Sequence, residues 1–212
     1  MSNSNFKSMS ALKENVSRET FQNLEHFIAL LSKWNKAINL VSYRTEDELW
    51  QRHILNSAEL INYIPKDSKI LTDLGSGGGF PGIIIAILLD IEVHLVESDV
   101  RKSVFLTEAA IFAKNKVFVH NARIEEVTPW ESDVLTARAL APLADLITMS
   151  QHFIKKNKIC LFQKGKNSVE EIKEAKDQVG HNYIISEIPI SLESSVVTVK
   201  ENIHGRYRSK SS

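Results

Sequence analysis

The stretch that most constrains the fold of this chain is Asp73–Gly82, which reads Asp-Leu-Gly-Ser-Gly-Gly-Gly-Phe-Pro-Gly. It joins an apolar strand pattern over residues 69–74 to an apolar helix pattern over residues 83–89. Its glycines open backbone dihedrals that are closed to other residues, and they let a ligand approach the N–H groups at the helix start. The stretch therefore predicts a strand, a turn that a ligand can approach closely, and the N-terminus of a helix.

The glycine pattern matches a dinucleotide-binding fingerprint only in part. The turn has glycines at alternate positions: Gly75, Gly77 and Gly79. Phe80 stands where the fingerprint requires its last glycine, which weakens a pyrophosphate-binding interpretation without excluding it. A second strand pattern, residues 93–97, ends in Glu97 roughly 20 residues after the glycines, the offset expected for a ribose-binding carboxylate. With Asp73 before the turn as well, a turn without a ligand becomes the less favoured interpretation.

This combination of residues resembles the S-adenosylmethionine site of the doubly wound methyltransferases. The resemblance implies that the acid before the loop, Asp73, lies near the methionine end of the cofactor. It also implies that the second acid, Glu97, holds the adenosine hydroxyls. S-adenosyl-L-methionine is therefore the expected cofactor.

Strand and helix patterns alternate along most of the chain. The strand patterns cover residues 69–74, 93–97, 116–120, 133–137, 158–163, 183–190 and 196–201, and the later helix patterns cover 101–114, 142–155 and 168–179. This alternation predicts an α/β fold with a doubly wound, mostly parallel seven-stranded sheet and helices on both faces. The last two strand patterns have no helix between them, which predicts an antiparallel edge.

The N-terminal part of the chain has a different pattern. Residues 17–38 and 46–63 place apolar side chains at helical spacing, with Ser17 as an N-cap. The aromatic stripe on the first of these helices is interpreted as core, not as a base-stacking surface. We expect three parts: a helical N-terminal extension over residues 1–66, a main α/β domain over 67–204, and a polar basic tail over 205–212.

Composition limits the kinds of partner. Lys+Arg and Asp+Glu both number 26, so no net charge draws in a polyanion, and any nucleic-acid surface must be a local patch. The single Cys160 lies in an apolar run and is interpreted as a core residue. The seven histidines are scattered, which predicts no metal site, and His94 is interpreted as structural. Without a signal-peptide pattern or a membrane-length apolar run, we expect a cytosolic chain with no membrane role.

Basic residues follow several of the predicted strands. Arg123, Arg138 and Lys164 come after or at the end of the third, fourth and fifth strand patterns. Each alone is typical of a solvated loop. Because ligands bind beyond the carboxyl ends of parallel strands, the three together predict a rim that faces phosphates.

Short motifs along the chain fit one known family. They are Trp34-Asn35 with Asn39-Leu40, Arg52-His53-Ile54-Leu55 with Ser57, the Asp73–Gly82 stretch with its Phe-Pro-Gly end, Arg123 before Glu125, Arg138-Ala139 and Lys164-Gly165. Over residues 17–180 the chain resembles the RsmG family, also called glucose-inhibited division protein B. The resemblance implies a Rossmann-like class I methyltransferase that acts on guanine N7 in bacterial 16S ribosomal RNA.

Carried over residue by residue, the resemblance implies particular contacts. Those with the cofactor are Gly75, Phe80, Ile124, Glu125 and Arg138, while Arg123, Lys164 and Arg138 face and position the RNA. The expected substrate is 16S ribosomal RNA within the small ribosomal subunit or a precursor particle, and a monomer is expected. Two departures are visible: Asn56 replaces the usual acid before Ser57, and residues 204–208 lack the basic, proline-containing signature of the family's end.

The expected chemistry is consistent with what the sequence lacks. Guanine N7 has a free lone pair, so the site needs to position the base and has no proton to remove. The run Arg138-Ala139-Leu140-Ala141 follows the fourth strand where exocyclic-amine methylators have an Asn/Asp-Pro-Pro-aromatic motif, and no cysteine stands as a nucleophile. Two alternatives stay open: a nicotinamide-dependent oxidoreductase, opposed by Phe80, and a non-catalytic RNA-binding assembly factor.

Overall fold

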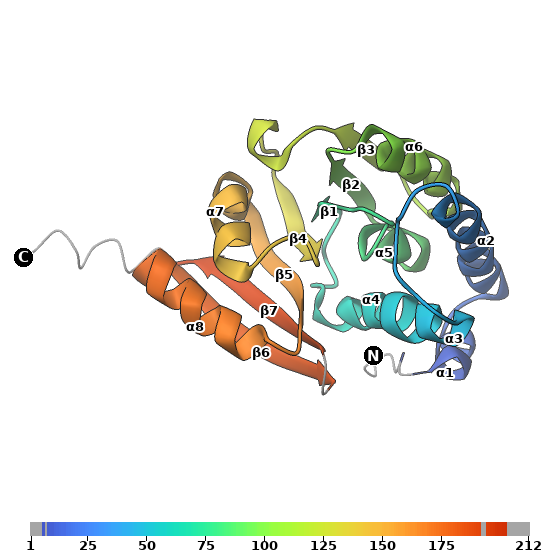
Figure 1. The fold of residues 1–212 in the computed structure, drawn as a ribbon, viewed down its shortest axis with the longest axis horizontal. Helices are drawn as coiled ribbons and strands as arrows, with labels where there is room; N and C mark the ends of the chain where they lie inside the picture. The colour runs from blue at the N-terminus through green and yellow to red at the C-terminus, as the bar shows by residue number, and fades with distance from the viewer. Residues whose placement is uncertain (1–5, 7, 192–193, 203–212) are drawn as a thin grey trace, which may run out of the picture.

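The computed structural model describes residues 6, 8–191 and 194–202, and Figure 1 shows their path. Its sheet has seven strands in the order β3-β2-β1-β4-β5-β7-β6. They are β1 (Ile70–Leu74), β2 (Glu92–Glu97), β3 (Val117–Asn121), β4 (Ser132–Arg138), β5 (Asn157–Gly165), β6 (Tyr183–Ser191) and β7 (Ser194–Glu201). Strands β1 to β5 pair in parallel, and β7 pairs antiparallel with β5 and β6. The predicted sheet and its antiparallel edge are confirmed.

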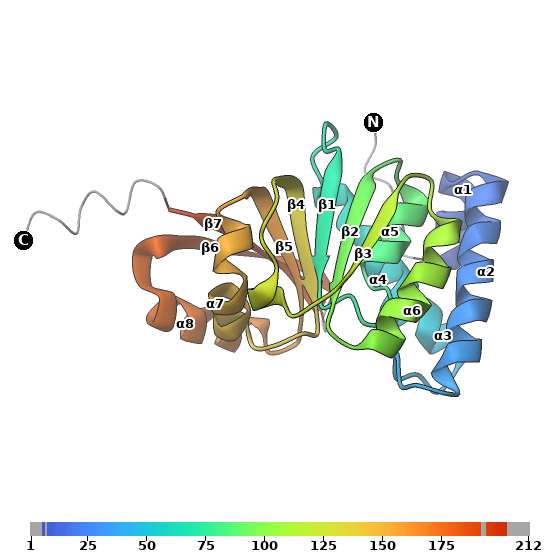
Figure 2. The same ribbon diagram turned by 90° about the horizontal axis from the view of Figure 1, so that it is seen from above.

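Helices cover both faces of this sheet. They are α1 (Met9–Asn15), α2 (Arg18–Asn35), α3 (Glu46–Leu49), α4 (Asn56–Glu59), α5 (Gly82–Leu88), α6 (Val100–Ala109), α7 (Leu143–Ile154) and α8 (Ser168–Val179). Helices α1, α2, α5 and α6 share one hydrophobic cluster with Leu71 and Leu95, and α7 and α8 share another with Leu135 and Phe162. Figure 2 shows the two groups of helices on opposite sides of the strands. Alternate strand residues supply the two cores, as the strand period requires.

The N-terminal helices belong to the main core. Helix α2 begins as predicted after Ser17, whose hydroxyl accepts a hydrogen bond from the Thr20 N–H at 3.1 Å. Helix α1 has no counterpart in the sequence-based prediction, yet its Leu12 is fully buried in the cluster that contains α5. The predicted boundary at residue 66 therefore falls between elements that share one core, and the predicted tail, residues 205–212, lies outside the described residues.

The second predicted helix, residues 46–63, is not a continuous α-helix. Between α3 and α4 lies a π-helical segment, Trp50–Leu55, and a 3-10 turn, Leu60–Tyr63, ends the run. The Arg52 carbonyl in the π segment accepts a hydrogen bond from the Arg138 guanidinium at 2.6 Å. A π turn inserted in a helix shifts the phase of the apolar pattern without ending it, so periodicity does not reveal it.

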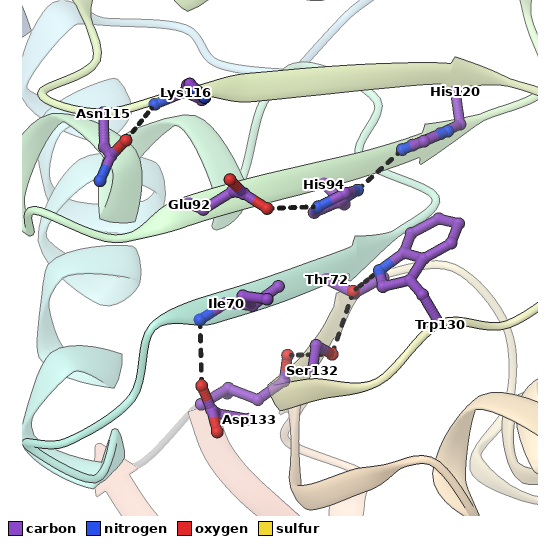
Figure 3. Close-up of polar contacts among 11 residues, drawn as sticks. Ile70, Thr72, Glu92, His94, Asn115, Lys116, His120, Trp130, Ser132 and Asp133 are labelled. Carbon is purple, nitrogen blue, oxygen red and sulfur yellow. Dashed lines mark hydrogen bonds and ion pairs between the residues drawn. The ribbon is translucent and has the colours of Figure 1, made fainter.

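A polar network ties together the strands on the edge of the sheet formed by β1, β2 and β3 (Figure 3). His94 lies between Glu92 and His120. The Nε2 of His94 is 3.1 Å from the Glu92 carboxylate, and the Nδ1 of His94 is 3.0 Å from the Nε2 of His120. Trp130 packs against both imidazoles and donates from its Nε1 to the Thr72 hydroxyl at 2.9 Å. These contacts give His94 the structural role predicted for it.

Other features of the described residues bear on chemistry. Cys160 is 1% exposed in β5, and burial raises the pKa of its thiol, as expected for a core residue. Within residues 6, 8–191 and 194–202, no cluster of three or more His, Cys, Asp or Glu side chains could hold a metal ion. No helix in these ranges is both long enough and apolar enough to cross a membrane.

Candidate active site

The glycine loop, residues 75–79, crosses the carboxyl end of β2. The Gly75 and Ser76 N–H groups both donate to the Val96 carbonyl, at 2.8 and 3.2 Å. Positive φ angles occur at Gly75 (+64°), Gly77 (+52°) and Gly79 (+87°), and these conformations favour glycine. The predicted strand, turn and helix start are present, with α5 beginning at Gly82.

Glu97 ends β2 directly beside this loop. Its Oε2 accepts a hydrogen bond from the Gly77 N–H at 2.9 Å, and its Oε1 accepts one from the Asp99 N–H at 2.8 Å. The side chain is 7% exposed, so these amides fix the carboxylate in one orientation. Each oxygen keeps a further lone pair for a donor such as a ribose hydroxyl.

A cleft of about 680 Å³ lies over the loop and the end of β2, within the range typical of small-molecule sites. It brings together most of the residues singled out from the sequence: Gly75, Gly77, Phe80, Glu97, Arg123, Ile124, Glu125 and Arg138. The structure thus collects side chains from β2, from the segment after β3 and from the end of β4 around one space. Three of the predicted site residues, Asp73, Gly79 and Lys164, are placed elsewhere.

Asp73, a predicted cofactor-binding residue, is not among the residues that line the cleft. It is fully buried beneath the loop, where its carboxylate accepts hydrogen bonds from the Thr136 hydroxyl at 2.7 Å and the Gly82 N–H at 3.3 Å. Burial raises the pKa of this carboxyl to about 6. Asp73 therefore joins β1, β4 and the start of α5, and so supports the loop from below.

Gly79 is also absent from the cleft wall. A Cβ at this position would lie 2.9 Å from Ile83 Cγ1 and 3.4 Å from the Phe27 ring, so this glycine allows close packing against α5 and α2. Gly78, which the sequence pattern did not single out, lines the cleft instead. A Cβ on Gly78 would lie 2.9 Å from Val41 Cγ1, so the glycine loop and the segment around Val41 approach closely.

Lys164 is buried and does not form part of the exposed basic rim that the sequence predicted. Its side chain is 7% exposed, and its Nζ bonds to Glu171 Oε2 at 2.6 Å and to the Ala141 carbonyl at 2.7 Å. These two acceptors, with burial, hold the ammonium in a structural ion pair beside a second cleft. Arg123 and Arg138 line the first cleft, whereas Lys164 lines the second.

Arg138 fixes the N-terminal helices to the sheet. Its guanidinium donates to the Arg52 carbonyl at 2.6 Å and to the His53 carbonyl and Ser57 hydroxyl at 3.4 Å each. It also lies 5.9 Å from the centroid of the Phe80 ring. Burial foremost, then the neighbouring Arg52 charge, lowers the pKa of Arg138 to about 10, which leaves it cationic at neutral pH.

The N-terminal part of the chain supplies a wall of the cleft that sequence patterns did not reveal. It consists of Leu40, Val41, Ser42, Arg52 and His53. Asn35 holds this wall in place, because its Oδ1 accepts from the Leu40 and Val41 N–H groups at 2.8 and 3.0 Å. The signal that could have found it is the Trp34-Asn35 and Asn39-Leu40 motif, which carries no periodicity of its own.

Comparison with known proteins agrees with this geometry. The model of the GidB family, described as rRNA small subunit methyltransferase G, matches residues 20–196. The chain belongs to this family. Curated relatives called "Ribosomal RNA small subunit methyltransferase G" include one from Gluconobacter oxydans, 49% identical over 76% of this chain and 82% of its own length. Another, from Cereibacter sphaeroides, is 42% identical over 87% of this chain and 91% of its own length.

Solved structures place the fold of this GidB-family chain among methyltransferases. A ribosomal protein L11 methylase from Lactobacillus delbrueckii has a TM-score of 0.58 and 15% identity, over 72% of this chain and 80% of its own. A putative RNA methyltransferase from Pyrococcus horikoshii has a TM-score of 0.55 and 21% identity, over 86% and 99%. The family resemblance drawn from the sequence motifs is confirmed, and the enzyme is a methyltransferase and not an oxidoreductase.

Proposed function

We propose that this chain transfers the methyl group of S-adenosyl-L-methionine to N7 of one guanine in 16S ribosomal RNA. The single observation that carries the proposal is the cleft over the glycine loop, with the Glu97 carboxylate fixed beside it, in a chain of the GidB family. We further propose that the substrate is the RNA in a small ribosomal subunit or its precursor, and that the enzyme acts as a cytoplasmic monomer.

The residues around the loop fit S-adenosylmethionine. A Cβ on Gly77 would meet only the Gly75 carbonyl oxygen at 3.7 Å, so the loop presents bare main chain to the cleft. Glu97 is the candidate acceptor for the ribose hydroxyls, and Ile124 and Phe80 supply apolar surface. When bound, the cofactor supplies a methyl group on a sulfonium. The protein's part is to hold both reactants in line.

The titratable groups of the cleft favour a nucleophile that needs no deprotonation. His53 lines the cleft, and burial foremost, with the nearby Arg138 charge, lowers the pKa of its imidazole to about 4. An imidazole with that pKa is a weak base at neutral pH. The Glu97 oxygens already accept from two backbone amides. Guanine N7, whose lone pair is free, suits a site built in this way.

The zero net charge of the chain favours a folded ribosomal particle over bare RNA as the substrate. The net charge of the chain is zero, so long-range attraction for bare RNA is weak. Recognition then depends on RNA shape and on local cations such as the exposed Arg123 at the cleft edge.

The test uses small subunits from cells that lack this gene. Purified protein and labelled S-adenosylmethionine are added, and the modified base is mapped by reduction and aniline cleavage, because N7 methylation makes guanosine sensitive to both. We expect one new cleavage site in 16S RNA. Cofactor and subunit binding without methyl transfer would instead support the non-catalytic assembly factor, and methylation at another atom would contradict the N7 assignment.

A further inference from the structure

A second cleft adjoins the first and has its own polar wall. Its volume is about 670 Å³, and it lies over the carboxyl ends of β4 and β5. The two clefts share the residues Arg52, Arg138, Ala139 and Leu140. If the first cleft holds the methyl donor, as proposed above, a base in the second would meet it at this shared wall.

Gln163, on this wall, has an acceptor without a donor. Its side chain is 8% exposed, and its Oε1 has no hydrogen-bond partner in the described part of the chain. Its Nε2 donates to the Asn56 carbonyl at 2.6 Å. Because only the NH₂ group can donate to a carbonyl, this bond fixes which end of the amide is which. A buried acceptor left in this state costs free energy that a donor from a bound group can recover.

The carboxylate on this wall is already occupied. Glu171 lines the same cleft, but its Oε2 accepts from the Lys164 ammonium at 2.6 Å and from the Leu143 N–H at 2.9 Å. The cations of the wall, Arg52 and Arg138, can donate but cannot accept. Gln51, Asn56, Ser194 and Ser195 also line this cleft with neutral side chains that can accept, but among the described residues of its wall only Gln163 has a buried side-chain acceptor without a hydrogen-bond partner.

We propose that the second cleft receives the target guanine and that Gln163 Oε1 accepts a hydrogen bond from its Watson–Crick edge, at N1–H or the 2-amino group. This inference rests on the proposed function. Adenine has a lone pair at N1 and no 2-amino group, so neither position offers this oxygen a donor, and the contact would favour guanine over adenine. Register supports the placement, since Gln163 is the Cα partner of Arg138 on the neighbouring strand, at the wall that the two clefts share.

The experiment pairs a protein change with changes in the base. Gln163→Met removes the oxygen and keeps the length of the side chain. Small subunits are reconstituted with guanosine at the mapped position, with inosine, which lacks the 2-amino group, or with 2-aminopurine, which lacks N1–H. Methylation rates (kcat/KM) and subunit affinities without methyl donor are measured for wild type and variant.

We expect Gln163→Met to lower kcat/KM on guanosine by about 10- to 100-fold. On the analogue that lacks the contacted N–H, the same variant should lose about 3-fold or less, because wild type has already lost that bond. The tie from Gln163 to Asn56 is broken in every pairing, so its structural effect cancels in the comparison. Gln178→Met, at an exposed position on α8, is the matched control and should change nothing.

The outcomes separate this inference from the proposed function. An equal loss for Gln163→Met on guanosine and on both analogues would give Gln163 a purely structural role and overturn the inference. A wild-type protein that methylates no guanosine in the subunit would instead overturn the proposed function.

Discussion

The two walls of the active-site region are built in different ways. The loop wall consists of the glycine loop and Glu97, and its key hydrogen bond, from Gly77 N–H to Glu97, spans 20 residues of sequence. The clamp wall consists of Arg138, Gln163 and Lys164 at the ends of β4 and β5. Its ties to the N-terminal helices span 86 residues, from Arg138 to Arg52, and 107 residues, from Gln163 to Asn56.

This difference explains what each wall does. Backbone conformation creates the loop wall, because positive φ angles and bare main chain there leave room for a ligand. Side chains that reach across the fold create the clamp wall, and they spend most of their hydrogen-bonding capacity on the protein itself. Changes to the loop wall should therefore act mainly on cofactor binding, and changes to the clamp wall on stability and RNA.

The largest expected effect comes from Gly77→Val in the loop wall. A branched side chain at φ +52° is strained. Its atoms would also enter the cleft, because a Cβ at this position would have only the Gly75 carbonyl oxygen within 4 Å. We expect calorimetry to detect no binding of S-adenosylmethionine. Gly180→Val is the control, since Gly180 has a φ of +61° with no atoms within 4 Å and ends α8 far along the sequence from the loop. That variant should lose stability yet bind the cofactor, and equal loss of binding in both would attribute the effect to backbone strain alone.

A second prediction concerns Asp73, which supports the loop wall from below. Burial raises the pKa of this carboxyl from 3.8 to about 6, so the folded state binds its proton more tightly than the unfolded state. The contribution of this carboxyl to the free energy of unfolding is therefore greatest well below pH 4. It falls as the pH rises through about 6 and is constant at higher pH, and the total loss is about 3 kcal/mol. Asp73→Asn keeps an acceptor for the Gly82 N–H and has no such dependence.

The measurement is urea unfolding of both proteins from pH 4 to pH 8. Other groups titrate in this range, His53 among them, but they are common to both proteins and cancel in the difference. The stability of wild type relative to Asp73→Asn should fall by about 2 kcal/mol between pH 4 and pH 6. A difference that is constant with pH would show that Asp73 keeps an ordinary pKa in the folded protein.

The comparison also shows why sequence predicted one wall better than the other. The positions of the strands and helices and the loop follow from local patterns of period 2 or 3.6 and from glycine spacing. The burial of Asp73 and Lys164 depends on which elements pack over them, here α5 and α8, and no local pattern encodes that. The wall around Val41 depends on the side chain of Asn35. The π-helical segment is held by Arg138, which lies far along the chain.

A third, smaller effect is expected from Arg138→Met in the clamp wall. The variant removes the donor to the exposed Arg52 carbonyl and to the partly buried His53 carbonyl, so both acceptors lose this bond. We expect the free energy of unfolding to fall by about 1–3 kcal/mol. Arg101→Met is the control, because its guanidinium is 72% exposed and makes only a 3.8 Å ion pair with Asp99, which contributes little. If both variants are equally stable in urea, Arg138 does not hold the N-terminal helices.

The smallest expected effect separates two cations that the sequence grouped into one rim. Arg123 is exposed at the edge of the first cleft, whereas the Lys164 ammonium is paired with Glu171 and the Ala141 carbonyl. A plot of log affinity against log salt has a negative slope, and each phosphate contact that is lost reduces the magnitude of this slope by about one unit or less. In a salt series with 16S RNA, Arg123→Ala should flatten this slope, and Lys164→Met should lower stability without flattening it. Equal flattening by both variants would mean that Lys164 leaves its ion pair to bind a phosphate, which would restore the rim predicted from the sequence.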